Sequence, residues 1–131
     1  MHNGSCLCGA VKYEVRGDLG AGVYCHCSRC RKASGSAFAS NAVVAAKDFV
    51  VVKGEDSLKK FSTPAGLHRL FCANCGSPIL SRRDSLPDVV RLRLGTLDTP
   101  VPVAPSAHIF VASKAGWWEI RDRLPQHPER P

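Results

Sequence analysis

Short stretches in which apolar and polar residues alternate run along much of the 131-residue chain. Over residues 9–15, Val11, Tyr13 and Val15 fall on one face and Lys12 and Glu14 on the other, which is the pattern of a half-buried β-strand. Residues 90–94 alternate in the same way. Gly, Pro, Asp and Ser separate further candidates, which cover residues 38–44, 49–53, 58–61, 69–71, 79–82, 108–111 and 117–120. The pattern therefore predicts a mainly β fold.

Helical periodicity is not sustained in any window of the sequence. Residues 28–33 are predicted to form one or two helical turns with Ser28 as the N-cap. Residues 124–131 contain three prolines and are predicted to be irregular. Since no linker or low-complexity segment interrupts the chain, we expect a single domain over residues 1–131.

The composition is that of a soluble globular protein, with 44% apolar and 22% charged residues. The apolar stretches, such as residues 42–46, are too short to span a membrane, and the first residues lack the pattern of a signal peptide. We therefore expect a cytoplasmic protein. The formal charge of +7 becomes smaller once cysteine ionisation and bound metal are counted. The remaining mild positive balance favours anionic ligands but does not by itself indicate nucleic-acid binding.

All seven cysteines lie in three tight clusters, which makes metal binding the first candidate chemistry. In a reducing compartment, an odd number of closely spaced cysteines favours metal ligation over disulfides. A closed structural zinc site takes four protein ligands, and a catalytic site takes three and keeps one position open. The sequence thus predicts two zinc ions with different roles, drawn from Cys6 and Cys8, from Cys25, Cys27 and Cys30, and from Cys72 and Cys75.

Cys72 and Cys75, followed by Gly76, have the spacing of a zinc knuckle. A knuckle supplies two ligands, so a second pair must come from elsewhere. Cys6 and Cys8, also followed by a glycine, are the natural second pair, and a site that joins these two segments would contribute to the folding free energy. Spacing alone leaves open an exchanged pairing, in which the knuckle belongs with the middle cluster.

Cys25, Cys27 and Cys30 are predicted to form an open tripod whose fourth position accepts water or a substrate thiol. One alternative makes His26 the fourth ligand of a second structural site, although residues adjacent in sequence usually point away from a shared ion. Another leaves the second site empty, with thiols open to oxidation.

The basic residues Arg29, Arg31 and Lys32 surround the tripod in the sequence. They are either a solvated turn or a dock for substrate carboxylates, which arginine binds in a bidentate manner. Arg91 and Arg93 share a strand face that we interpret as solvated. We expect His108 to be a histidine of the core or of a sheet face. Trp117 and Trp118, if they lie on a strand, place one ring in the core and the other on the surface.

Three cysteine-containing segments closely resemble the family of glutathione-dependent formaldehyde-activating enzymes and centromere protein V. The matching stretches are residues 4–11, 24–32 and 71–79, followed by residues 105–111 and the Trp117–Trp118 pair. The resemblance implies a β-tent, in which sheets pack around a structural zinc. It also implies that Cys6, Cys8, Cys72 and Cys75 hold the structural ion and that Cys25, Cys27 and Cys30 hold the catalytic one.

The activity implied by the resemblance is the condensation of glutathione with formaldehyde into S-hydroxymethylglutathione, formally a carbon–sulfur lyase reaction run in reverse. Glutathione or a similar thiol is then the expected small-molecule partner, with no membrane involved. The alternative is a non-enzymatic zinc module that binds a protein or a nucleic acid, as the centromere-protein branch suggests. The sequence has no basic stripe with interleaved aromatic residues, which argues against nucleic acid.

Overall fold

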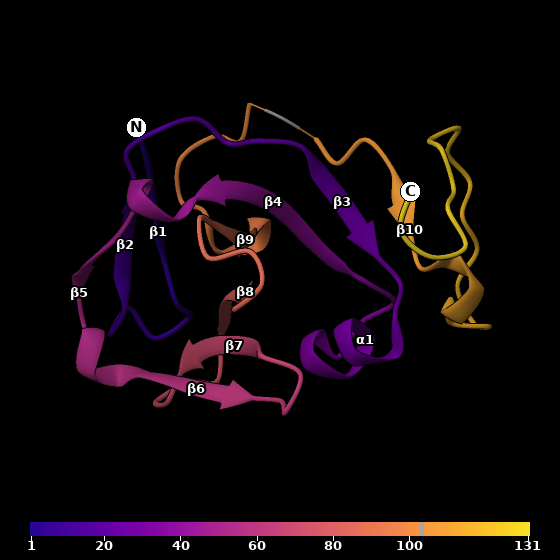
Figure 1. Ribbon diagram of the computed structural model, residues 1–131. Coiled ribbons are helices and arrows are strands. Elements are labelled where there is room, and N and C mark those ends of the chain that lie inside the picture. The colour runs from indigo at the N-terminus through magenta and orange to yellow at the C-terminus, as the bar shows by residue number, and fades with distance from the viewer. Residues whose placement is uncertain (103) are drawn as a thin grey trace.

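The protein is built on two β-sheets, and its computed structural model describes residues 1–102 and 104–131 (Figure 1). The smaller sheet is antiparallel and contains β1 (His2–Ser5), β2 (Lys12–Val15) and β5 (Phe49–Lys53), in the order β1-β2-β5. The larger sheet has the order β10-β3-β4-β9-β8-β7-β6, antiparallel except between β10 and β3. Its strands are β3 (Gly22–Cys25), β4 (Ala39–Ala45), β6 (Leu58–Ser62), β7 (Leu67–Cys72), β8 (Pro78–Arg83), β9 (Val89–Arg93) and β10 (His108–Ile109).

In residues 1–102 and 104–131, helical structure is limited to one short α-helix and single 3₁₀ turns. Helix α1 (Ser28–Ser34) lies beside the larger sheet (Figure 1) and ends at Gly35, whose φ of 64° is left-handed. The predicted N-cap is wrong by one residue, because Cys27 occupies that position and its sulfur accepts from the backbone N–H of Cys30. The 3₁₀ turns are η1 (Ala46–Asp48), η2 (Glu55–Ser57), η3 (Leu94–Thr96) and η4 (Val111–Ser113). The mainly β prediction is confirmed.

The main core is formed where the two sheets pack against each other. The alternating residues Val11, Tyr13 and Val15 all point inward and are at most 1% exposed. Strand β9 contributes Val90 and Leu92 to the same core, as its alternation predicted. Since side chains alternate along a strand, the residues between them on β9 point to the opposite face of the larger sheet.

The predicted strand over residues 117–120 is wrong. Residues 116 and 117 form a turn, in which the N–H of Trp118 donates to the carbonyl of Ala115, and residues 118–120 are not part of a strand. Trp118 still packs against Phe38 and His26, and Trp117 is 72% exposed. Aromatic residues thus mark a packing site here rather than a strand.

Two strands, β1 and β3, were not predicted. β1 has the sequence His-Asn-Gly-Ser and β3 the sequence Gly-Val-Tyr-Cys. Neither shows a clear apolar alternation, and both are held by pairing with neighbours, so tertiary pairing overrides local preference. Within the described part of the chain, no helix has both the length and the apolarity needed to cross a membrane.

Candidate functional site

Four cysteines from two distant loops come together at one end of the core. Cys6 and Cys8 lie between β1 and β2, and Cys72 and Cys75 lie at the end of β7 and in the turn that follows. Both turns close with a backbone hydrogen bond from a glycine to a cysteine carbonyl, Gly9 to Cys6 and Gly76 to Cys72. Their φ angles of 78° and 79° explain why glycine follows each pair.

The distances between these sulfurs fit one tetrahedral metal ion. All four lie within 4.8 Å of one another, with 3.6 Å between Cys6 and Cys8 and 3.9 Å between Cys8 and Cys72. Sulfur ligands of tetrahedral zinc, with bonds of about 2.3 Å, are separated by about 3.8 Å. The side-chain amide of Asn74 donates to Cys8 at 3.2 Å and lowers the pKa of that thiol. This cluster can therefore hold a metal, and the exchanged pairing is not what the structure adopts.

The other three cysteines form a second cluster at the end of β3 and the start of α1. Cys25, Cys27 and Cys30 also have sulfurs within 4.8 Å of one another. Hydrogen bonds from Cys25 and Cys30, with further bonds from backbone N–H groups of α1, lower the pKa of Cys27 to about 2. The same contact with Cys27 raises the pKa of Cys25. The Cys27 sulfur is thus stabilised as a thiolate, the form that binds metal.

These three cysteines line a cavity of about 270 Å³ on the face of the larger sheet opposite the core. Sheet register builds its floor: Arg69 on β7 pairs with Ser81 on β8, and Ser81 pairs with Arg91 on β9. Residues directly opposite one another in neighbouring strands present side chains on the same face. The cavity is lined from the other side by Ile109 of β10 and by Phe110.

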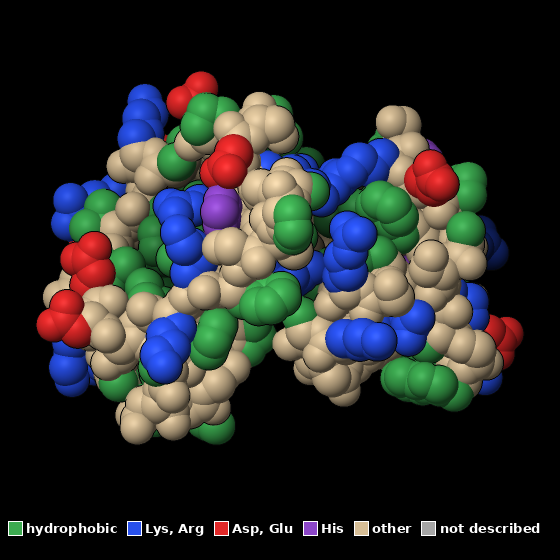
Figure 2. Space-filling model, turned by 60° about the horizontal axis from the view of Figure 1, so that its bottom comes forward, with side chains coloured by type: hydrophobic (Ala, Val, Ile, Leu, Met, Phe, Trp, Pro, Cys, Tyr) green, Lys and Arg blue, Asp and Glu red, His purple; other side chains and the backbone are tan. Residues whose placement is uncertain are grey.

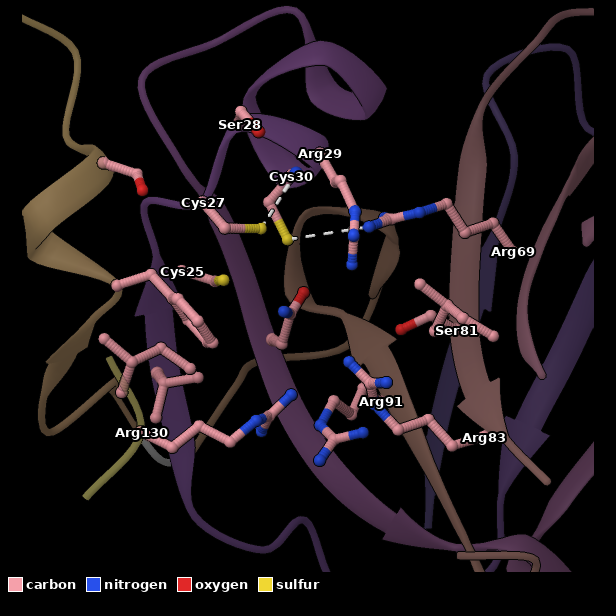
Figure 3. A pocket seen from close by; sticks show the side chains of 16 residues that line it. Cys25, Cys27, Ser28, Arg29, Cys30, Arg69, Ser81, Arg83, Arg91 and Arg130 are labelled. Atoms are coloured by element: carbon pink, nitrogen blue, oxygen red, sulfur yellow. Dashed lines mark hydrogen bonds between the residues drawn. The ribbon is translucent and has the colours of Figure 1, made fainter. Parts of the chain in front are cut away.

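Five arginines line this cavity (Figure 3). Two of them, Arg29 of α1 and Arg69, lie beside Cys30, and Arg69 Nη2 donates to the Cys30 sulfur at 3.9 Å. The guanidinium groups of the other three gather in a different part of the cavity, below the cysteines in the view of Figure 3; these are Arg83, Arg91 and Arg130.

Of the three basic residues singled out in the sequence, Arg29 lines the cysteine cavity. Lys32 lies instead along a neighbouring, more apolar groove, which Arg29 also borders, and Arg31 lines neither. The interpretation of Arg91 and Arg93 as a solvated face is wrong. Arg91 lines the cavity, and Arg93 is 8% exposed and donates to the side-chain oxygen of Asn41 at 2.6 Å. Alternation placed these two arginines on one face, but only sheet packing shows that this face is enclosed.

A chain of hydrogen bonds runs from the buried rings of His26 and His108 to the exposed residue Asp122. His26 Nε2 is 2.8 Å from His108 Nδ1, and His108 Nε2 is 2.9 Å from the carboxylate of Asp122. Since a carboxylate only accepts, the Nε2–H of His108 donates to it, and His108 Nδ1 accepts a hydrogen bond from the Nε2–H of His26. His26 Nδ1 is left buried without a partner, and burial lowers the pKa of His26 to about 4. The ring nitrogens of His26 lie outside the three-cysteine cluster, and His108 is fully buried, as expected.

Residues 1–113 match the family model described as glutathione-dependent formaldehyde-activating enzyme. The chain belongs to this family. The match spans both cysteine clusters and most of the cavity, and it confirms the resemblance found in the sequence.

Relatives and a solved structure agree with this assignment. A Halomonas elongata protein, provisionally named for the same activity, is 30% identical over 92% of this chain and 81% of its own length. An Aspergillus flavus protein with the same provisional name is 26% identical, and this chain spans about half (54%) of its length. A crystal structure of a Rhodobacter sphaeroides protein aligns with a TM-score of 0.64 and 28% identity, covering 76% of this chain and 91% of that one.

Proposed function

We propose that the protein is a zinc-dependent enzyme of the carbon–sulfur lyase type, acting on glutathione or a similar thiol and its aldehyde adduct. The observation that carries the proposal is the placement of three cysteine sulfurs in the wall of a cavity ringed by guanidinium groups. Its volume of about 270 Å³ is near the lower end of small-molecule sites, roughly 300–1,000 Å³. Membership in the family supports the same substrate class.

In this proposal one cysteine cluster has a structural role and the other a catalytic role. Cys6, Cys8, Cys72 and Cys75 hold a structural zinc, because four thiolates close the coordination shell and tie two distant loops together. Cys25, Cys27 and Cys30 hold the catalytic zinc in the same single domain. A zinc ion with three protein ligands supplies Lewis acidity and lowers the pKa of a thiol that binds to it.

The residues of the chain bind and orient the substrate. In the condensation, a carbon–sulfur bond forms, the carbonyl π bond breaks and the thiol proton ends on the carbonyl oxygen, so no oxidant or reductant is needed. Arg29 and Arg69 place positive charge beside the sulfurs, where it stabilises a thiolate. The apolar side chains of Val23, Ile109 and Phe110 on the cavity wall limit the access of water.

A non-enzymatic module that binds a protein or nucleic acid is the second candidate. Lysine and arginine side chains lie on both lobes of the face shown in Figure 2, which favours an anionic ligand of either size. The three cysteines, however, lie within a cavity rather than on an exposed ridge, and a macromolecule bound across this face would leave their chemistry unused. The enclosed sulfurs favour the small-molecule enzyme.

The test combines metal counting with a direct rate measurement. About two zinc ions per chain are expected in the purified protein. Magnetisation-exchange NMR with ¹³C-formaldehyde and glutathione should show faster adduct exchange with the protein than without it. Cys27→Ser should abolish this acceleration and keep the circular dichroism spectrum, whereas Cys72→Ser should lose the folded spectrum. Unchanged exchange with fully zinc-loaded protein would rule out the proposed reaction.

A further inference from the structure

The wall of the cysteine cavity is strongly unbalanced in charge. Five arginines line it, and no aspartate or glutamate is among its lining residues in the described part of the chain. The three thiolates that a metal would neutralise all lie at one end. The other end is therefore positive without compensation from the protein.

These arginines are also without acidic partners. The ion pairs of the described residues involve Arg16 and Arg121, together with two histidine–aspartate contacts, and none reaches the cavity. Arg69 Nη1 is buried and has no hydrogen-bond partner. Burial lowers the pKa of Arg91, and the charges of Arg130 and Arg83 lower it further. Like charges held this close destabilise the empty cavity, and bound anionic groups relieve the repulsion.

The arrangement separates a sulfur end from an anion end. Arg29 and Arg69 flank the cysteines, while Arg83, Arg91 and Arg130 converge in another part of the cavity (Figure 3). Arg130 also lies over the ring of Phe110, at 5.5 Å from its centroid, which directs its side chain toward the cavity wall. Three guanidinium groups offer more donors than one carboxylate can accept.

Glutathione matches only part of this cavity. Its two carboxylates suit the guanidinium groups, but its γ-glutamyl arm also carries an ammonium group at the end remote from the sulfur. An ammonium group that loses part of its water shell on binding needs a carboxylate partner, and the cavity lining provides none. Placing the ammonium near Arg83, Arg91 and Arg130 adds a like charge instead.

We propose that the cavity selects a thiol that carries at least two anionic groups and no ammonium group away from its sulfur, with Arg83, Arg91 and Arg130 as the anion-binding subsite. The inference rests on the proposed function in one respect, the docking of the substrate sulfur at Cys25, Cys27 and Cys30. It goes beyond that function by stating which charged groups the rest of the substrate carries.

The test is calorimetric titration of the full-length, zinc-loaded protein with glutathione and with glutaryl-cysteinyl-glycine, which is glutathione without its amino group. We expect the des-amino thiol to bind at least tenfold more tightly. Arg83→Gln should weaken its binding at least tenfold and reduce its advantage over glutathione. Arg82→Gln is the matched control, because Arg82 is the preceding residue of β8, lies on the opposite face, is exposed and lines no part of the cavity; it should bind as the unmodified protein does.

S-methylation of both ligands separates the two claims. If the des-amino ligand binds more tightly and S-methylation weakens it, both the subsite and the sulfur dock stand. If it binds more tightly but S-methylation has no effect, the subsite stands and the sulfur contact of the proposed function fails. If glutathione binds as tightly or more tightly, or if Arg82→Gln and Arg83→Gln act alike, the inference is overturned, and a remaining S-methyl effect still supports the sulfur dock. If neither thiol binds, both claims are overturned.

Discussion

Gly54 lies where two backbone segments approach too closely for a side chain. It follows β5 with a left-handed φ of 78°. A Cβ atom at this position would overlap the carbonyl oxygen of Ala10, and would lie 2.7 Å from the Ala10 carbonyl carbon and 3.1 Å from Val11 Cα. These are backbone atoms, so a rotamer change cannot relieve the overlap. Ala10 is two residues beyond Cys8, and the contact therefore supports the four-cysteine loop.

We expect Gly54→Ala to lower the free energy of unfolding by about 3 kcal/mol. Placing alanine in the left-handed region costs roughly 1–2 kcal/mol, and forcing extra atoms into a packed site adds about 1–3 kcal/mol. This is a large part of a typical total of about 5–15 kcal/mol. Because the Cys6–Cys8 loop must shift, metal affinity at the four-cysteine cluster should fall as well.

Urea unfolding followed by circular dichroism, at a fixed free zinc concentration, measures the change. Two glycine variants are the controls. Gly35→Ala has a φ of 64° but no atom within 4 Å of the new Cβ, and should lose only about 1–2 kcal/mol. Gly95→Ala has open space and no left-handed φ, and should be neutral or stabilising by up to about 1 kcal/mol. If Gly54→Ala loses no more than Gly35→Ala, the argument from close approach is refuted.

Three further results are expected. Tyr13→Phe removes a buried hydroxyl that is 2.6 Å from Thr96 Oγ1, and should lower the free energy of unfolding by about 1 kcal/mol; an unchanged urea midpoint would contradict this. Trp118→Ala should cost about 2 kcal/mol, whereas Trp117→Ala, at a 72% exposed position, should cost under about 0.5 kcal/mol in the same assay. Burial lowers the pKa of His26 from 6.5 to about 4, so between these pH values the unfolded chain binds a proton that the folded chain does not. The free energy of unfolding should therefore fall as the pH drops from about 6.5 to 4. An equally steep fall in His26→Asn would exclude His26 as the cause.

The alternation of Val11, Tyr13 and Val15, and of Val90 and Leu92, was enough to predict buried strand faces. Local spacing carries this information because side chains of a strand alternate between faces whatever its partners are. The strand β1 was missed because its polar residues carry no such pattern, and its structure comes from pairing with β2.

The sequence by itself determined the three cysteine segments, the knuckle turns with their glycines, and the mainly β fold, since these depend on residues close together in the chain. Tertiary structure alone decided that Cys6 and Cys8 meet Cys72 and Cys75, because spacing permitted another pairing. It also decided the cavity wall, where strand register and the C-terminal segment bring Arg69, Arg83, Arg91 and Arg130 into one cavity. From the sequence alone, a charged residue on a strand is predicted to be exposed to solvent. The structure shows otherwise here, because residues distant in sequence form the opposite wall of the cavity.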